Sequence, residues 1–345
     1  MNTTLDIEQP AALIAYLRAR GDLLPDEQPQ IDVLAGGVSN RTVRVTLPQR
    51  GETWVLKQAL EKLRVAVDWF SSPQRIHREA LGLRWLGQIA PPGTLPDFVF
   101  EDHDAHILAM RAVPEPHHNW KRLLLDGGLQ TDHVQQFALL LGTIHLRAAH
   151  QREAVAAAFE DRSFFESLRL EPYYAYSAAQ VQPASSFLNH LIAETRATRL
   201  TLVHGDYSPK NILVHQDRLI LLDHEVIHYG DPAFDVGFSM THLLSKAHHL
   251  PEQRAVFAQA ALGYWQTYAG IIAPAEWSAA LEARAVRHTL ACLLARVAGR
   301  SPLEYLGESQ RAHQRAAVLA LLPDPPAAMP ELIHAFLKQL DTEFT

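Results

Sequence analysis

The first third of the chain shows one helical pattern followed by several short strand-like runs. Between residues 9 and 20 the apolar residues Leu13, Ile14 and Leu17 recur at helical spacing, and Gly21 is positioned to end the helix. The later runs are short, rich in Val, Leu and Ile, and bounded by turn residues, which predicts strands. The predicted strands span 31–34, 42–47, 53–56, 98–101 and 106–110, and a helix over 71–89 interrupts them. This order predicts an α+β unit.

Helical spacing dominates the rest of the chain. Pro114 and Pro116 interrupt any regular element, so we place one domain at residues 1–113 and a second at 114–345. Between residues 200 and 227, runs of Leu, Ile and Val surround a polar loop, which predicts a small β-rich insert. The predicted helices span 132–150, 185–196, 233–248, 252–268, 275–297 and 309–322. A β-rich N-terminal lobe and a mostly helical C-terminal lobe are therefore expected.

Composition excludes several classes of protein. The 345 residues carry a formal net charge of −7, which argues against a broad nucleic-acid-binding surface. Cys292 is the only cysteine, so an internal disulfide and a thiolate zinc site are both excluded. No apolar run approaches the ~20 residues that span a bilayer, and residues 1–10 lack the apolar segment of a signal peptide. We therefore expect a cytoplasmic protein without a membrane partner; its oligomeric state cannot be read from the sequence.

The densest group of polar residues lies in the predicted β-rich insert. His204-Gly205-Asp206-Tyr207-Ser208-Pro209-Lys210-Asn211 connects two strand-like runs, so Asp206 and Asn211 are presented from a loop held at both ends. Twelve residues after Asn211, Asp223 follows the run 219–222 at the end of a predicted strand. A carboxylate beside such a loop is well placed to hold a divalent cation through oxygen.

These residues resemble the signature of a known enzyme family. The pattern His204-x-Asp206-x4-Asn211, followed by Asp223-x-Glu225 and by the run 230–235, is similar to that of the kinase-like small-molecule phosphotransferases. This group includes the aminoglycoside phosphotransferases, the choline and ethanolamine kinases and the methylthioribose kinases. The resemblance implies a two-lobed, protein-kinase-like α+β fold, with a nucleotide-binding N-terminal lobe and a catalytic, substrate-binding C-terminal lobe. Gly205, the Asp223-His224-Glu225 run and the lack of an activation segment argue against a protein kinase.

The N-terminal lobe contains residues that match the family's nucleotide site. Gly36 and Gly37 fall where the loop over the phosphates is expected, and Ser39 or Asn40 can add a donor there. Lys57, on a predicted strand, resembles the lysine that contacts the α- and β-phosphates. Glu79 on the following predicted helix is the favoured ion-pair partner of Lys57, with Glu61 as a weaker alternative.

The resemblance also implies a role for each residue of the C-terminal site. ATP would donate its γ-phosphate to a hydroxyl group of a small molecule such as an amino alcohol, a sugar or an aminoglycoside-like compound. Asp206 would act as the catalytic base, and Asn211 and Asp223 would hold Mg²⁺. Glu225 would be an additional or water-mediated metal contact. His204 would brace the loop through a hydrogen bond.

Two other functions remain open from the sequence alone. A non-catalytic module would bind ATP without phosphorylating anything. The run His224-Glu225-x-x-His228 matches the zinc-hydrolase pattern, which requires a helix so that both histidines share one face. The run 219–222 is strand-like and Gly230 follows soon after, and a zinc hydrolase would leave Asp206 and Asn211 without a role. The phosphotransferase interpretation is therefore preferred.

The acceptor is the least determined feature. Tyr173, Tyr174 and Tyr176 cluster in the sequence and are candidates for an ammonium cage, although core packing explains them more simply. The resemblance to methylthioribose kinases, in which basic residues of the late helices approach the sugar phosphate region, implies Arg296 and Arg300 as candidate equivalents. Among the 19 histidines, His103 and His106 flank a predicted turn, and no partner at metal-ligand spacing is evident from the sequence.

Overall fold

The computed structural model describes residues 5–34, 39–64 and 69–341 and divides into two compact units. The first unit comprises Met1–Gln88, Leu95–Glu115 and the three residues Asp223–Glu225. The second comprises Ile89–Thr94, Pro116–Leu222 and Val226–Thr345. The chain therefore leaves and re-enters the first unit more than once.

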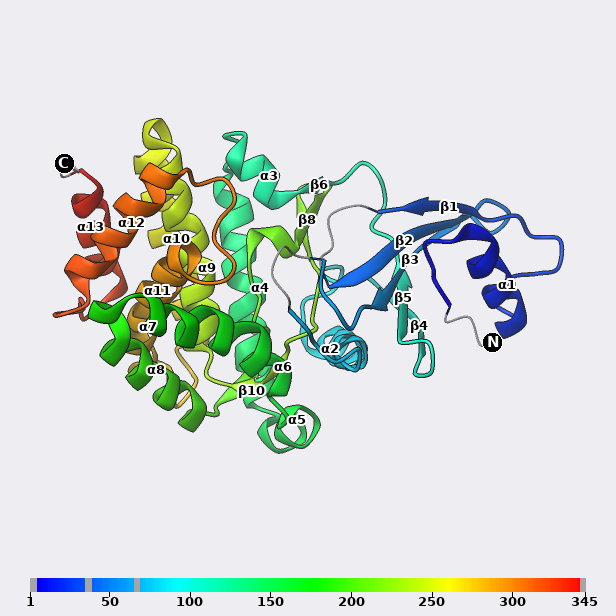
Figure 1. Ribbon diagram of the computed structural model, residues 1–345, viewed down its shortest axis with the longest axis horizontal. Helices are drawn as coiled ribbons and strands as arrows, with labels where there is room; N and C mark the ends of the chain where they lie inside the picture. Colours follow the sequence, from blue (N-terminus) through cyan, green and yellow to red (C-terminus); the bar gives the residue numbers. More distant parts are fainter. Residues whose placement is uncertain (1–4, 35–38, 65–68, 342–345) are drawn as a thin grey trace. The chain divides into compact units, whose positions relative to one another are not determined.

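The first unit is built on a five-stranded antiparallel sheet with strand order β1-β2-β3-β5-β4 (Figure 1). Its strands are β1 (Gln30–Val33), β2 (Asn40–Leu47), β3 (Glu52–Ala59), β4 (Phe98–Asp102) and β5 (Ile107–Arg111). All five predicted strands are confirmed. The turn between β2 and β3 contains Gly51, whose φ is 64°.

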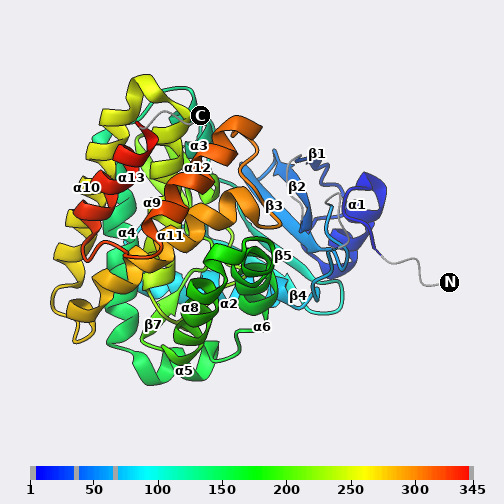
Figure 2. The same ribbon diagram turned by 60° about the vertical axis from the view of Figure 1, so that its left-hand side comes forward.

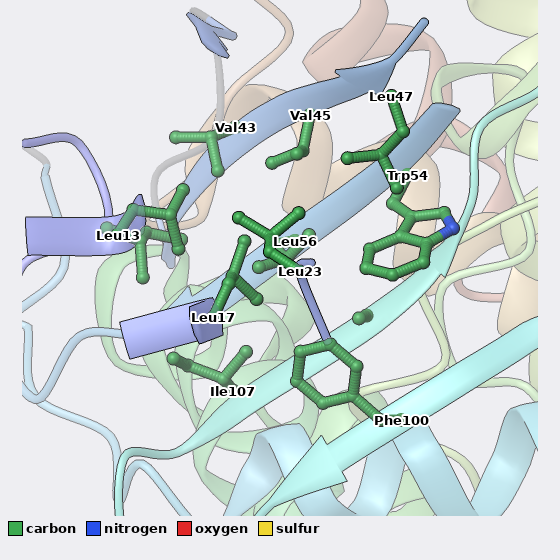
Figure 3. Close-up of a cluster of buried hydrophobic side chains, with 12 residues drawn as sticks. Leu13, Leu17, Leu23, Val43, Val45, Leu47, Trp54, Leu56, Phe100 and Ile107 are labelled. Atoms are coloured by element: carbon green, nitrogen blue, oxygen red, sulfur yellow. The ribbon is translucent and has the colours of Figure 1, made fainter. Parts of the chain in front are cut away.

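The two faces of the sheet pack on different helices. Helix α1 (Pro10–Arg20) packs Leu13 and Leu17 on one face, where they meet Val45 and Leu56 (Figure 3). Helix α2 (Arg75–Ile89) packs Ile76, Ala80 and Leu83 on the other face. Because side chains alternate along a strand, Lys57 of β3 shares the α2 face with Ala59. This alternation determines which helix Lys57 can reach.

Both helix predictions in this unit are correct in type. Helix α1 ends at Gly21, whose φ of 81° is the left-handed conformation that glycine adopts readily. Helix α2 begins at Arg75, four residues after the predicted start. Ser72 and Pro73 form the turn that precedes it, since their carbonyl oxygens accept from the N–H groups of Arg75 and Ile76.

The second unit is mostly helical. In Figures 1 and 2, helices α9, α10, α11, α12 and α13 lie close to one another. The helices of the unit are α3 (Trp120–Leu125), α4 (Thr131–Ala149), α5 (Arg152–Phe159), α6 (Ser163–Phe165), α7 (Tyr176–Gln180), α8 (Ser185–Ala197), α9 (Ala233–His249), α10 (Arg254–Ile272), α11 (Leu281–Ala298), α12 (Glu308–Leu321) and α13 (Met329–Leu340). A π-helical segment, Glu166–Ala175, lies between α6 and α7.

Helix α9 forms the centre of this unit, and its residues 233–248 are all buried. Gly237 allows α9 to approach α11 closely, because a Cβ at this position would lie 2.5 Å from the Cβ of His288. The predicted helices are confirmed, except that α11 starts at Leu281 rather than near 275, after a turn over 273–277 and a short 3-10 helix, Ser278–Ala280. No helix in the described part of the chain has the length and apolarity needed to cross a bilayer.

Short strands in the second unit frame the polar loop, as the sequence predicts. They are β6 (His118–Asn119), β7 (Thr201–Val203), β8 (Ile212–His215), β9 (Arg218–Leu221) and β10 (His228–Gly230). Strand β7 pairs with β10, and β8 pairs with both β6 and β9. The loop between β7 and β8 is therefore fixed at both ends by sheet hydrogen bonds.

Candidate active site

The loop between β7 and β8 is held in place by the buried carboxylate of Asp235, at the start of α9. Asp235 accepts hydrogen bonds from the backbone N–H of His204 (2.7 Å) and of Gly205 (2.8 Å), and its Oδ2 lies 3.2 Å from His145 Nε2. Gly205 has φ 78°, and a Cβ there would lie 2.9 Å from Val226 Cγ2, so this position requires glycine. The His204 ring braces the loop as expected, because its Nδ1 accepts from the Asp206 N–H at 3.2 Å.

The Asp206 side chain is held through one of its two oxygens. Its Oδ2 accepts from Asn211 Nδ2 at 2.7 Å and lies 2.8 Å from Arg169 Nη2. Within the described residues no donor reaches Oδ1, and the side chain remains 12% exposed. The loop thus presents one carboxylate oxygen with a fixed direction, which is what a general base requires.

Arg169 is a site residue that no sequence pattern predicted. It lies in the π-helical segment, and its Nε donates to the Gly205 carbonyl at 2.9 Å while its guanidinium also meets Asp206. One side chain therefore fixes both the backbone and the carboxylate of the loop. No motif identifies Arg169, because it lies 37 residues before Asp206 in a segment for which no helix or strand was predicted.

Lys57 in the first unit lies between two carboxylates. Its Nζ donates to Glu79 Oε1 at 2.6 Å and to Asp223 Oδ1 at 3.2 Å. Burial by itself lowers the pKa of Lys57, but the charges of Asp223 and Glu79 outweigh it and hold that pKa above its ordinary value. Burial raises the pKa of Glu79 to about 7, although the Lys57 ammonium opposes this shift. Glu79, and not Glu61, is therefore the partner of Lys57.

Asp223 has a backbone conformation that is rare for a non-glycine residue, with φ 68°. Such strain is kept where the surrounding structure fixes a side chain for a purpose. The preceding Leu222 donates its N–H to the carbonyl of Asn211 at 2.9 Å, so the chain returns to the end of the β7–β8 loop just before Asp223. Asn211 uses its amide nitrogen on Asp206, which leaves its Oδ1 as a ligand atom. A carboxylate and an amide oxygen are donors that fit Mg²⁺.

Arg75, at the start of α2, is a second residue that no sequence pattern predicted. Its side chain is fully buried, its Nε donates to Glu225 Oε2 at 3.1 Å, and its Nη1 and Nη2 donate to backbone carbonyls that include those of Ser39 and Leu60. The Glu225 carboxylate thus faces an arginine within the first unit. Its predicted role as a metal contact remains a prediction.

The predicted phosphate loop is only partly described. Gly36 and Gly37 lie outside the described residues. Ser39 and Asn40 are both buried where β2 begins, and Asn40 Nδ2 donates to Ser39 Oγ at 3.3 Å. The Ser39 carbonyl also accepts from the N–H of Leu60 at 3.0 Å. Any contact of Ser39 or Asn40 with phosphate remains a prediction.

Cationic side chains gather in the second unit around two tyrosines. Arg169 and Arg296 lie 5.8 and 5.5 Å from the Tyr173 ring centre, and Arg296 Nη1 donates to the Tyr173 hydroxyl at 3.1 Å. Lys121 and Lys246 lie 5.9 and 5.3 Å from the Tyr305 ring centre. Both rings therefore already have two basic neighbours. We refer to these six residues as the basic cluster.

The structure does not support the zinc-hydrolase interpretation of His224-Glu225-x-x-His228. The segment is irregular at His224, turns at Glu225 and enters strand β10 at His228. The helix that would place both histidines on one face is absent from this described segment. Instead the His228 ring stacks on Phe165, with ring centres 4.0 Å apart.

Known proteins resemble the chain in sequence over most of its length. Residues 30–271 match the model of the Phosphotransferase enzyme family. Methylthioribose kinase 2 of Oryza sativa subsp. japonica is 24% identical over 266 residues, which is 68% of this chain and 62% of that protein. The chain thus aligns with less than two thirds of the length of this curated relative.

Solved structures share the fold across nearly the whole chain. The amicoumacin kinase hAmiN, solved with AMP-PNP, Ca²⁺ and Ami, superposes with a TM-score of 0.59 at 16% identity, covering 96% of this chain and 100% of that one. The macrolide 2'-phosphotransferase MphH from Brachybacterium faecium superposes with a TM-score of 0.53 at 19% identity, covering 97% and 99%. The expected protein-kinase-like α+β fold is confirmed. Since the family model matches well over half of its length, the chain belongs to the Phosphotransferase enzyme family.

Proposed function

We propose that the protein transfers the γ-phosphate of ATP to a hydroxyl group of a small molecule. The observation that carries this proposal is the Asp206 carboxylate, whose Oδ2 is committed to Asn211 and Arg169 while Oδ1 has no donor within the described residues. Oδ1 accepts the proton of the acceptor hydroxyl as the hydroxyl oxygen attacks the γ-phosphorus, the bond from this phosphorus to the β-phosphate oxygen breaks, and ADP leaves. Holding the base in one orientation lowers the entropic part of the barrier.

The remaining residues act on the donor nucleotide. Asn211 and Asp223 would hold Mg²⁺ through oxygen, with Glu225 as an additional or water-mediated contact, and the ion would neutralise negative charge on the phosphate oxygens. Lys57, kept charged by Glu79 and Asp223, is a point charge suited to the α- and β-phosphates. Gly36, Gly37, Ser39 and Asn40 are proposed to cover the phosphates.

The basic cluster determines the class of acceptor. Burial, together with the charges of Lys246, Arg296, Lys121 and Lys210, holds the pKa of His242 well below its ordinary value. A cationic acceptor would meet the arginine charges of the basic cluster, and both tyrosine rings already have basic neighbours. The ammonium cage suggested by the tyrosines is therefore not part of this proposal.

Polar atoms in the same region favour a neutral or anionic polyhydroxyl acceptor. Arg296 Nε, Tyr305 Oη and His242 Nδ1 are buried and have no hydrogen-bond partner within the described residues. Buried polar groups are costly unless they are bonded, so a ligand that supplies hydroxyl groups would satisfy them. A sugar such as methylthioribose fits these requirements better than choline or an aminoglycoside.

ATP turnover across a panel of acceptors tests both parts of the proposal. We expect phosphorylation of methylthioribose or a related sugar, and rates at least about tenfold lower for ethanolamine, choline and aminoglycosides. Phosphorylation of choline or an aminoglycoside in preference to every sugar would overturn the acceptor class. ATP binding with no phosphorylated product from any acceptor would instead identify a non-catalytic nucleotide-binding module.

The role of Asp206 is tested by Asp206→Asn, which keeps the shape of the side chain but removes the base. We expect kcat to fall by about 10²–10⁴-fold while the affinity for ATP changes little. Asp126→Asn is the matched control, because the Asp126 side chain is 68% exposed in the same unit. Equal kcat in wild type and Asp206→Asn would rule out this base.

A further inference from the structure

Three side chains that take no part in phosphoryl transfer meet where α2 passes the β4–β5 hairpin of the first unit. They are His77 on α2, Glu101 on β4 and His103 in the hairpin loop, and one potential ligand atom from each lies within 4.8 Å of the others. We propose that His77, Glu101 and His103 form a binding site for a divalent transition-metal ion, with Zn²⁺ as the best fit. This site is independent of the magnesium site proposed above.

Two of the three separations between ligand atoms are near those of a zinc site. His103 Nε2 lies 3.3 Å from Glu101 Oε1, and His77 Nδ1 lies 2.6 Å from the same oxygen. Ligands at ~2.0–2.1 Å in a tetrahedron are about 3.3 Å apart. In the stacked rotamer of His103 the first pair has this separation, and the second needs to open by about 0.7 Å. Two imidazoles and a carboxylate match Zn²⁺, whereas Mg²⁺ prefers oxygen ligands alone.

His106 supports the orientation of the His77 ring that a metal ion requires. His106 Nδ1 lies 3.0 Å from His77 Nε2, on the opposite side of the ring from Glu101. When an ion occupies His77 Nδ1, the neutral imidazole carries its single proton on Nε2, which donates to His106 Nδ1. Ligating histidines are commonly held by such a second hydrogen bond. His106 is therefore a positioning residue and not a ligand.

The Glu101 carboxylate is likewise oriented through its second oxygen. Arg84 Nη1 donates to Oε2 at 2.8 Å, so Oε1 is the oxygen that faces both histidines. The Arg84 side chain is 43% exposed, and solvent screens the repulsion between its charge and a bound ion. The side chains of His77 and Glu101 are 10% and 6% exposed, which fixes two of the three ligands before an ion arrives.

His103 completes the site by a rotation of an exposed side chain. Its ring is stacked on His77 with centres 4.2 Å apart and planes 9° apart, and its side chain is 73% exposed. An imidazole lone pair lies in the ring plane, so two parallel stacked rings cannot both point at one ion. His103 is free of packing constraints that would prevent its ring from turning out of the stack.

Ion binding would connect two elements of the first unit. His77 and Glu79 are two positions apart on α2, about 200° around the helix axis, so they leave opposite sides of the helix. One side holds Lys57 through Glu79, and the other would hold β4 through the ion. We therefore expect bound Zn²⁺ to raise the thermal stability of the protein.

Zinc titration of the full chain, prepared without a polyhistidine tag and without nucleotide, tests the site. We expect one equivalent of Zn²⁺ to bind and to raise Tm, while Mg²⁺ at the same concentration gives no comparable shift. His103→Ala, at an exposed position, should lower the zinc affinity about 100-fold or more without changing the Tm of the metal-free protein. The control His190→Ala, at an exposed histidine of the other unit, should bind as wild type does.

Two further variants distinguish a ligand from a positioning residue and this site from the magnesium site. His106→Phe should weaken zinc binding about 10–100-fold while the visible spectrum of bound Co²⁺ keeps the shape seen in wild type, as expected for a positioning residue. Asp223→Asn should bind zinc as wild type does. The proposal is overturned if wild type does not bind zinc, if His103→Ala binds it unchanged, or if Asp223→Asn abolishes binding.

Discussion

At the scale of single residues, the orientation of a side chain matters as much as its chemical type. A free carboxylate offers two equivalent oxygens, but Asp206 has one oxygen held by Asn211 and Arg169. In the proposed reaction, only the other oxygen could accept a proton from the acceptor without losing a bond. The spacing of five residues between Asp206 and Asn211 is local and can be read from the sequence. Arg169 reaches the same carboxylate from a distant segment, so no local pattern predicts it.

Lys246 is a buried residue whose charge depends on pH in the neutral range. Its Nζ donates to the His242 carbonyl at 3.2 Å, and no ion pair within the described residues includes it. Burial, with a smaller contribution from Lys121, lowers the pKa of Lys246 to about 7 from an ordinary value of 10.5. The folded protein therefore releases this proton near neutral pH, whereas the unfolded chain keeps it.

This difference predicts how stability changes with pH. Between its folded and unfolded pKa values the unfolded state binds more protons at Lys246, so its contribution to the free energy of unfolding rises with pH. The slope is at most about 1.4 kcal/mol per pH unit. Urea unfolding at about pH 7 and about pH 8.5 should show this rise in wild type and a clearly smaller one in Lys246→Met. Equal slopes in the two proteins would contradict the low pKa of Lys246.

At the scale of elements, the start of α2 is organised by one buried arginine. Arg75 donates to carbonyls just before the helix start, at Ser71 and Ser72, and to those of Ser39 and Leu60. Its Nε pairs with Glu225. The helix that carries Glu79 therefore begins on a residue bonded to several segments of the first unit.

Removal of Arg75 should be costly. Arg75→Met leaves the buried Glu225 carboxylate without this partner and should lower the free energy of unfolding by about 3–5 kcal/mol. Glu225→Gln in the same background should recover part of the loss, because the remaining buried charge is removed. Urea unfolding of both single variants and the double variant measures the coupling. Strict additivity of the two changes would mean that the pair contributes no energy of its own.

The elements themselves are largely predictable, and the reasons are physical. Alternation in β2 and β3 predicts both strands and the shared face of Lys57 and Ala59, because the period of a strand is local. The π-helical segment was not predicted, since Pro172 lies within it and its pattern fits neither common period. The charges around Tyr173 and Tyr305 come from separate helices, so their meeting depends on packing that no sequence period records.

The candidate metal site could not be predicted from the sequence for the same reason, because its histidines come from distant segments. Glu101 and His103 are two residues apart, and His77 lies 24 residues before Glu101. No ligand spacing is evident in the sequence around His103 and His106, because the partner comes from α2 on the sheet face. Conversely, the local pattern at His224 and His228 matched a zinc motif that the backbone does not support. A sequence motif predicts a site only when the helix or strand that carries it places the motif residues on one face.

At the scale of the whole molecule, the first unit is discontinuous. It includes Asp223–Glu225, although the chain on both sides of this tripeptide belongs to the second unit. Asp223 supplies one of the two carboxylates on Lys57, and Glu225 supplies the carboxylate on Arg75. A boundary drawn near Pro114 therefore separates buried charges of the first unit from their partners.

This discontinuity predicts that residues 1–115 do not fold stably alone. Without the tripeptide, Arg75 is buried with no carboxylate and Lys57 keeps only Glu79. The unpaired buried charge should cost several kcal/mol, which is a large part of the stability of a domain this small. Circular dichroism during thermal unfolding should show no cooperative transition for the fragment, in contrast to the full chain. A cooperative transition at the midpoint of the full chain would contradict this expectation.

The tripeptide Asp223–Glu225 also restricts which hybrids between members of the family can fold. A hybrid made by joining the N-terminal unit of one relative to the C-terminal unit of another inherits residues 223–225 from the wrong parent. Arg75 and Lys57 then meet carboxylates that evolved beside different partners. Viable hybrids should therefore need the tripeptide to travel with the N-terminal unit, and substitutions at positions 57, 75, 79, 223 and 225 should be inherited together.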